Sequence, residues 1–65
     1  MTHPRYIVGA RWRINKSEIK IPKIDLPHAQ LAYRGLMRRR KNPPSVVYIY
    51  DSVAKQMLEF RRLGV

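Results

Sequence analysis

The chain contains no cysteine, and in a sequence of 65 residues this absence strongly constrains what the chain can fold into. Short domains bury only a small fraction of their surface, and many depend on disulfides or a bound metal for stability. Without thiols, neither a disulfide framework nor a thiolate zinc site is available. The two histidines, His3 and His28, are far apart and match no metal-binding spacing. We therefore expect no cofactor, and a compact core or a partner chain that completes one.

The first apolar pattern has a period of two, which is typical of a half-buried strand. One face of this strand is predicted to carry Tyr6, Val8, Ala10, Trp12 and Ile14. After a turn signal at residues 15–17, the alternation resumes over residues 18–24. Pro22 cannot donate a hydrogen bond to a neighbouring strand, so the second strand belongs at a sheet edge or at a bulge. The two segments predict a β-hairpin, with a bulge between Ile21 and Ile24.

A helical pattern follows the hairpin. Apolar side chains recur at three- and four-residue spacing at Ala29, Ala32, Tyr33, Leu36 and Met37. Asp25 is the candidate N-cap of this helix, and Pro27 suits its first turn. The basic run over residues 38–41 is predicted to form the last turn, where cations oppose the negative end of the helix dipole. Asn42 and the two prolines after it end the helix.

Residues 45–50 contain a short, continuous apolar run that is rich in β-branched and aromatic side chains. This composition predicts a buried central strand. Within it, Tyr48 and Tyr50 share one face, and that face is a candidate for an open surface.

The segment over residues 53–63 allows two interpretations. The favoured one is a helix, with Asp51 or the serine after it as N-cap and Gly64 at the C-terminal cap. Good helix formers fill this segment, and no glycine marks a hairpin turn. The alternative is a hairpin, in which residues 51–55 form the turn and residues 57–62 return as a strand.

Together these segments predict an α+β fold, in which a small antiparallel sheet contains the hairpin and a third strand, and a helix covers one face. A C-terminal helix or a fourth strand completes it. We expect residues 1–5 to form a flexible N-terminal tail and residues 6–65 a single compact basic domain. No apolar run approaches the ~20 residues of a membrane span, and the N-terminus lacks the apolar core of a signal peptide. A cytoplasmic or nucleoid-associated protein is therefore expected.

Charge is the strongest signal of function. The chain has 14 Lys and Arg against 4 Asp and Glu, for a formal net charge of +10 at pH 7. A positive field of this size attracts polyanions, and nucleic acid is the first candidate for a small basic chain. There is no glycine-rich phosphate loop and no convincing catalytic constellation, so we do not expect an enzyme.

The basic residues form two groups in the sequence. We expect one side of the hairpin to carry Arg11, Arg13, Lys16, Lys20 and Lys23. The second group lies on and after the helical pattern and consists of Arg34, Arg38, Arg39, Arg40 and Lys41. Guanidinium groups suit phosphate geometry, so both groups are candidate nucleic-acid contacts. Three rings are candidates for stacking on bases, although core packing is favoured for the first: Trp12, Tyr48 and Tyr50.

The leading hypothesis is a small non-enzymatic protein that binds DNA or RNA through the phosphate backbone, using the basic hairpin and the Arg-rich helix. The alternative is a small regulator or inhibitor that binds an acidic surface of a larger protein machine such as a polymerase or nuclease. In either case we expect a monomer or a weak homodimer, because self-repulsion opposes association of two such basic chains.

Overall fold

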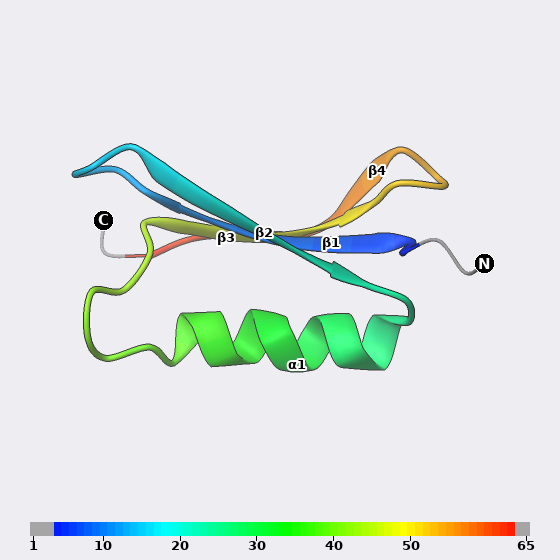
Figure 1. Cartoon of the computed structure of the whole chain (residues 1–65), viewed down its shortest axis with the longest axis horizontal. Helices are drawn as coiled ribbons and strands as arrows, with labels where there is room; N and C mark the ends of the chain where they lie inside the picture. Colours follow the sequence, from blue (N-terminus) through cyan, green and yellow to red (C-terminus); the bar gives the residue numbers. More distant parts are fainter. Residues whose placement is uncertain (1–3, 64–65) are drawn as a thin grey trace.

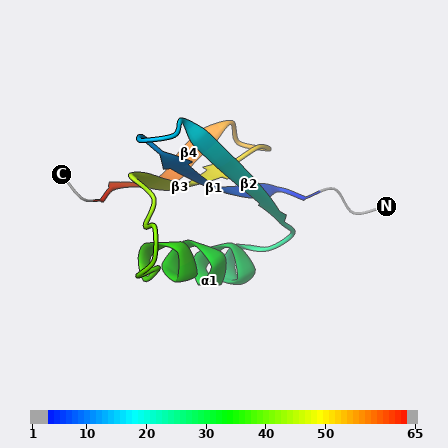
Figure 2. The same cartoon turned by 60° about the vertical axis from the view of Figure 1, so that its left-hand side comes forward.

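The computed structural model describes residues 4–63, which form a four-stranded antiparallel sheet with one helix on one of its faces (Figure 1). The elements in chain order are β1 (Tyr6–Trp12), β2 (Ser17–Lys23), α1 (Leu26–Met37), β3 (Val46–Asp51) and β4 (Gln56–Arg62). The strand order in the sheet is β2-β1-β3-β4, so two hairpins lie side by side and pair through β1 and β3. Figure 2 shows α1 on one side of the sheet, with both hairpin turns rising on the other side. The expected α+β fold is confirmed.

The first hairpin follows the period-two pattern. Val8 and Ala10 have no exposed surface, because their side chains face α1. β2 is an edge strand, as Pro22 predicts. Two details were wrong. Ile14, which was predicted to share the buried face of the strand, lies in the turn and is 99% exposed, because β1 ends at Trp12. The predicted bulge between Ile21 and Ile24 is absent from the pairing of β1 with β2, which continues in register to its last pair, Tyr6 with Lys23.

The predicted start of α1 is confirmed. Asp25 is the N-cap, and its Oδ1 accepts the backbone N–H of His28 at 3.0 Å. This hydrogen bond lowers the pKa of the Asp25 carboxyl below its ordinary value. Pro27 lies in the first turn, where its missing N–H costs nothing. The residues of the apolar pattern face the sheet, where three are buried and two are half-buried: Ala29, Tyr33, Leu36, Ala32 and Met37.

The predicted end of the helix was wrong. α1 ends at Met37 with Arg38 as its C-cap, so the rest of the basic run, residues 39–41, lies in the loop that returns to the sheet instead of in a helical turn. The loop is held by Trp12, whose indole N–H donates to the carbonyl oxygen of Asn42 at 2.8 Å. Asn42 has a positive φ of 53°, which reverses the chain ahead of the two prolines.

The favoured prediction for the C-terminal segment was also wrong, because residues 56–62 form strand β4 instead of a helix. β4 pairs with the edge of β3 that β1 leaves free, so the backbone polar groups on that edge gain partners. Lys55, with a φ of 53°, takes the left-handed position in the turn that a glycine often fills. A bulge interrupts the β3–β4 register between Ile49 and Tyr50. Gly64, the predicted cap of the helix, lies outside the described residues.

The core lies between α1 and the two central strands. It consists of Val8, Ala10, Trp12, Ala29, Tyr33, Leu36, Val47 and Ile49. β1 and β3 contribute five of these side chains and α1 contributes three. We call this side of the sheet the covered face, and the side without a helix the open face. Because side chains alternate along each strand, every second residue of β1 and β3 points toward the covered face and contributes to stability.

The end of the sheet near the N-terminus is held by an ion pair. Asp51 is buried, and its two carboxylate oxygens accept hydrogen bonds from the Nε and Nη2 of Arg5 at 3.1 and 3.0 Å. The backbone N–H groups of Val53 and Ala54 donate to Asp51 Oδ1 as well. The Arg5 hydrogen bonds hold the pKa of Asp51 below its ordinary value. Arg5, which the sequence placed in a tail, therefore closes the second turn.

Candidate functional site

Basic side chains that are distant in the sequence gather at one end of the molecule. This end holds the turn between β1 and β2, the loop after α1 and the last residues of β4 (Figure 1). We call it the basic end, and it comprises Arg11, Arg13, Lys16, Arg38, Arg39, Arg40, Lys41, Arg61 and Arg62. Antiparallel pairing causes this gathering, because it places the end of β1, the start of β3 and the end of β4 next to one another at the same end of the sheet.

Ser45 joins the segments of the basic end. Its backbone N–H donates to the carbonyl of Arg11 at 2.7 Å, and its hydroxyl accepts the N–H of Arg13 at 3.1 Å. Its carbonyl accepts the N–H of Leu63, which anchors the end of β4. The guanidinium carbon of Arg39 lies 5.5 Å from the ring centroid of Trp12. The basic side chains therefore project from a hydrogen-bonded backbone frame.

The open face is ordered in three rows that run across the sheet from β2 to β4. The row nearest the basic end holds Glu18, Arg11, Val46 and Arg62. The middle row holds Lys20, Gly9, Tyr48 and Phe60. The third row holds Pro22, Ile7, Tyr50 and Met57. Rings and apolar side chains thus occupy the middle of the face, and Arg11, Lys20 and Arg62 lie around them.

Tyr48 lies flat on the sheet because its neighbour on β1 is a glycine. A Cβ atom at Gly9 would fall 2.0 Å from Cζ of Tyr48, so only glycine leaves room for the ring at this place. The Tyr48 hydroxyl reaches across β1 and donates to Glu18 Oε2 on β2 at 3.1 Å. Burial, and then this hydrogen bond, raise the pKa of Tyr48. The ring is held in place from both ends, with one side against β1.

Glu18 is the carboxylate of the open face, and its contacts offset its charge. Besides the Tyr48 hydroxyl, it has the Nε of Arg11 at 3.6 Å, an ion pair between partly exposed side chains. Phe60 and Met57 are 55% and 46% exposed, and both lie on this face. The open face therefore presents rings and cations to solvent, and its carboxylate, Glu18, already has a hydrogen bond and an ion pair within the protein.

The predicted site residues do not all come together. Lys20 lies on the open face, while Lys23 pairs with Tyr6 and falls on the covered face, at the end away from the basic end. The expectation that the five hairpin cations share one side was therefore wrong for Lys23. Arg34 is exposed on α1, and Arg38 follows it one turn later as the C-cap of the helix. Lys41 does not continue this stripe, because it lies in the loop after α1. Trp12 is only 8% exposed and faces the core, so it is not a stacking surface.

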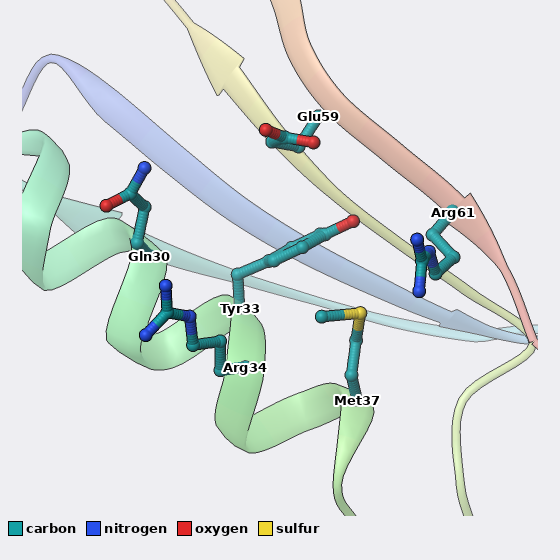
Figure 3. A pocket seen from close by; sticks show the side chains of 6 residues that line it. All are labelled: Gln30, Tyr33, Arg34, Met37, Glu59 and Arg61. Carbon is teal, nitrogen blue, oxygen red and sulfur yellow. The ribbon is translucent and has the colours of Figure 1, made fainter.

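A hollow lies between α1 and β4, on the covered face (Figure 3). The backbone of α1 packs on the other three strands and lies away from β4, which the side chain of Tyr33 approaches. Tyr33 extends from α1 into this groove, between Glu59 and Arg61 of β4. Burial, and then the charge of Glu59, raise the pKa of the Tyr33 hydroxyl. The groove is lined by both acidic and basic groups, so it lacks the single-sign charge of the basic end.

No cluster of three or more His, Cys, Asp or Glu side chains suited to a metal ion occurs within residues 4–63. His28 Nδ1 lies 2.6 Å from Asp25 Oδ1, so this imidazole contacts the helix cap. Asp25 and Asp51 both serve local structure away from the basic end. None of these groups forms a constellation for acid–base or nucleophilic catalysis.

Sequence reasoning did not find all of the surface residues that the fold assembles. The candidate residues did not include Met57, Phe60, Arg61 and Arg62, because residues 53–63 were interpreted first as a helix. Ile7 was not a candidate either, although the alternation in β1 places it on the face opposite Tyr6 and Val8. The alternation of Leu58 and Phe60 was a signal for the strand, although the bulge in β4 puts the pattern out of phase.

The chain matches no family model, no curated protein and no solved structure at the level that indicates a relationship. The function is therefore inferred from the chain's own geometry. In the part of the chain that the structure describes, no helix is long and apolar enough to cross a membrane.

Proposed function

We propose that this chain is a small, non-enzymatic nucleic-acid-binding protein that contacts phosphates through its basic end. The observation that carries the proposal is the gathering of cations from three separate segments on one hydrogen-bonded frame. Of this set, the side chains of the first turn and of the loop after α1 are exposed, so they need no rearrangement to reach a phosphate. Both elements of the original hypothesis contribute, although the Arg-rich segment acts as a loop instead of a helix.

The distribution of charge supports a polyanion as the ligand. Two of the four carboxylates lie outside the basic end, where Asp25 caps α1 and Asp51 holds the turn before β4, and Glu18 is paired with Arg11. A field of one sign at one end of a small protein steers a polyanion to that end and orients it there. Arginine forks and lysine ammonium groups are the side chains that contact phosphate oxygens in most such interfaces.

Titration of the protein against labelled duplex and single-stranded oligonucleotides, by fluorescence anisotropy at several salt concentrations, tests the proposal. If about 5–8 phosphates are contacted, the logarithm of affinity should fall with the logarithm of salt concentration with a slope of roughly −4 to −7 on duplex DNA. Absence of binding at low salt would overturn the proposal.

A pair of matched double variants separates local contact from net charge. Arg38→Gln with Arg40→Gln removes two exposed cations from the basic end, whereas Lys23→Gln with Lys55→Asn removes two from elsewhere. We expect the first variant to weaken binding and flatten the salt slope by about two, while the second has a smaller effect. Equal losses would show that net charge, and no particular surface, drives binding. Arg38→Gln with Arg40→Gln should keep its melting temperature, because exposed charges contribute little to stability. Thermal unfolding establishes that the second variant, which changes the half-buried Lys23, is folded as well.

The alternative of a regulator that binds an acidic protein surface is favoured by one observation, the exposed apolar side chains beside the cations. Phe60 and Met57 on the open face have the character of a protein-binding patch. A protein that binds no nucleic acid at low salt, yet forms a salt-sensitive complex with an acidic protein, would replace the nucleic-acid proposal with this one.

A further inference from the structure

We propose that the open face binds unpaired nucleic-acid bases, which stack on Tyr48 and Phe60 while neighbouring phosphates contact Arg11, Lys20 and Arg62. This inference rests on the proposed function and deepens it, because it selects single-stranded over duplex nucleic acid and assigns a surface to the bases. Two adjoining surfaces then have different roles: the basic end attracts the phosphate backbone of the nucleic acid, and the open face binds its bases.

The aromatic rings of the open face lie in positions that suit stacking. Tyr48 and Phe60 are directly opposite each other on β3 and β4, and Tyr50 follows on the same face of β3. The Tyr48 ring rests on the backbone at Gly9, so the side of the ring away from β1 is directed out of the sheet. Its bond to Glu18 fixes this orientation before any ligand arrives. Rigid, outward-facing rings in a row are the surface on which successive bases stack.

Cations lie beside these rings on the open face. Arg11 and Arg62 flank Val46 in the row nearest the basic end, and Lys20 stands at the β2 edge of the middle row. The side chain of Arg11 is 67% exposed, so it reaches solvent in spite of its ion pair with Glu18. Cations therefore lie along two sides of the rings and are continuous with the basic end. This charge favours an anionic ligand over a neutral protein surface or a second copy of this basic chain.

The width of the open face does not suit a duplex. Four strands spaced about 4.8 Å apart span about 14 Å between the outer strand axes, before side chains are counted. The major groove of B-DNA is about 12 Å wide and admits an α-helix or a two-stranded ribbon. Paired bases are also already stacked on each other, so exposed rings gain nothing from them. Unpaired bases satisfy both the shape and the chemistry of the open face.

The test uses a labelled deoxythymidine 12-mer, an abasic oligonucleotide of the same length and a duplex, with fluorescence anisotropy at one salt concentration. The key variant is Phe60→Leu, which keeps an apolar side chain and removes the ring. Its matched control is Leu31→Ala, which trims an exposed apolar side chain of α1 outside the open face; Leu31 is 65% exposed. Far-UV circular dichroism establishes that both variants are folded.

We expect the unmodified protein to bind the 12-mer more tightly than the abasic strand. Phe60→Leu should weaken binding of the 12-mer by about 5- to 100-fold, the range for loss of one base–aromatic stack. Binding of the abasic strand and of the duplex should not change, and Leu31→Ala should match the unmodified protein with all three ligands. A 12-mer with 5-iodouracil should cross-link under ultraviolet light to residues of β3 and β4.

The outcomes separate the two proposals. If Phe60→Leu binds the 12-mer normally while Arg38→Gln with Arg40→Gln loses affinity, the proposed function stands and the open-face inference is overturned. If neither single strand nor duplex binds at low salt, both are overturned. If Phe60→Leu lowers the sedimentation mass without affecting nucleic-acid binding, the open face is a dimer interface, and the inference is likewise overturned. Cross-links confined to α1 would also contradict it.

Discussion

The two faces of the sheet are built from alternate residues of the same strands, yet they differ in almost every physical respect. On the covered face, Val8, Val47 and Ile49 have no exposed surface and pack against α1. On the open face, the neighbouring residues include Tyr48 and Phe60, together with cations that no helix covers. The difference follows from the topology, because α1 is the one helix of residues 4–63 and it shields a single side.

Within each strand, the buried residues stabilise the fold, and the residues that alternate with them remain accessible to solvent and to a ligand. Side chains on the covered face lose contact with water on folding and supply the apolar free energy that holds the sheet together. Side chains on the open face keep part of their contact with solvent, so most of them can be changed at less cost in folding. Gly9, on which the Tyr48 ring rests, is the exception. Four substitutions test this division, starting with the largest expected effect on stability.

Trp12→Ala removes the largest side chain of the covered face. We expect a loss of about 3–5 kcal/mol in the free energy of unfolding, because the substitution leaves a cavity and frees the loop that Trp12 holds. Urea unfolding followed by far-UV circular dichroism measures this loss. A cost below about 1 kcal/mol would show that the covered face does not carry the stability of the fold.

Gly9→Ala places a methyl group against the Tyr48 ring, on the open face. We expect a cost of about 1–3 kcal/mol, because the ring must lift from the sheet to avoid the new Cβ. The same substitution in a Tyr48→Ala background should cost much less, since the clashing ring is then absent. A double-mutant cycle by urea unfolding checks this, and equal costs in the two backgrounds would contradict the close approach.

Asp51→Asn weakens the ion pair with Arg5 at the end of the sheet. The pKa of Asp51 is lower in the folded than in the unfolded chain. The ion pair therefore stabilises the fold at pH values above 3.8, which is the ordinary pKa of this carboxyl. This stability is lost as the pH falls through the lowered pKa. We expect the variant to melt a few degrees lower at neutral pH and to lose less stability on acidification. Thermal unfolding from neutral to acidic pH measures both.

The charge-matched control for that variant is Glu59→Gln on β4, whose side chain is exposed. Its melting temperature at neutral pH should stay close to that of the unmodified protein. If Glu59→Gln lowers the melting temperature as much as Asp51→Asn, overall charge balance and not the Arg5 contact is responsible.

Phe60→Ala should have the smallest effect on stability. The side chain is 55% exposed and its main partner is the opposite residue, Tyr48, so we expect a cost of up to about 1 kcal/mol. The same unfolding measurement as for Trp12→Ala allows a direct comparison of an aromatic residue on each face. A cost as large as that of Trp12→Ala would mean that the open face is part of the core.

Much of the fold could be predicted from local pattern. The alternation from Tyr6 to Trp12, the N-cap at Asp25 and the edge position of Pro22 were all predicted and are confirmed. Each depends on properties of a few adjacent residues: side-chain period, a capping carboxylate and a missing N–H donor. The sequence also indicated that Tyr48 and Tyr50 share a face, because residues two apart in a strand point the same way.

The candidate site was predicted only in part. Its cations were identified, but their grouping was not, because Lys23 and Arg34 fall outside the basic end while Arg61 and Arg62 join it. The grouping of the cations depends on which strand ends lie next to one another at one end of the sheet. That information lies in pairings between residues far apart in the chain, which no local pattern encodes.

Sequence alone determined which segments alternate, where the helix begins and how strongly the chain attracts polyanions, since these follow from neighbouring residues and from composition. Tertiary structure decided the conformation after β3. Asp51 accepts the N–H groups of Val53 and Ala54 as a helix cap does, and an Asp-initiated turn uses the same bonds, so the local signal was ambiguous. Pairing with the free edge of β3 satisfied a whole row of backbone groups, and this outweighed the helix propensity of residues 56–62.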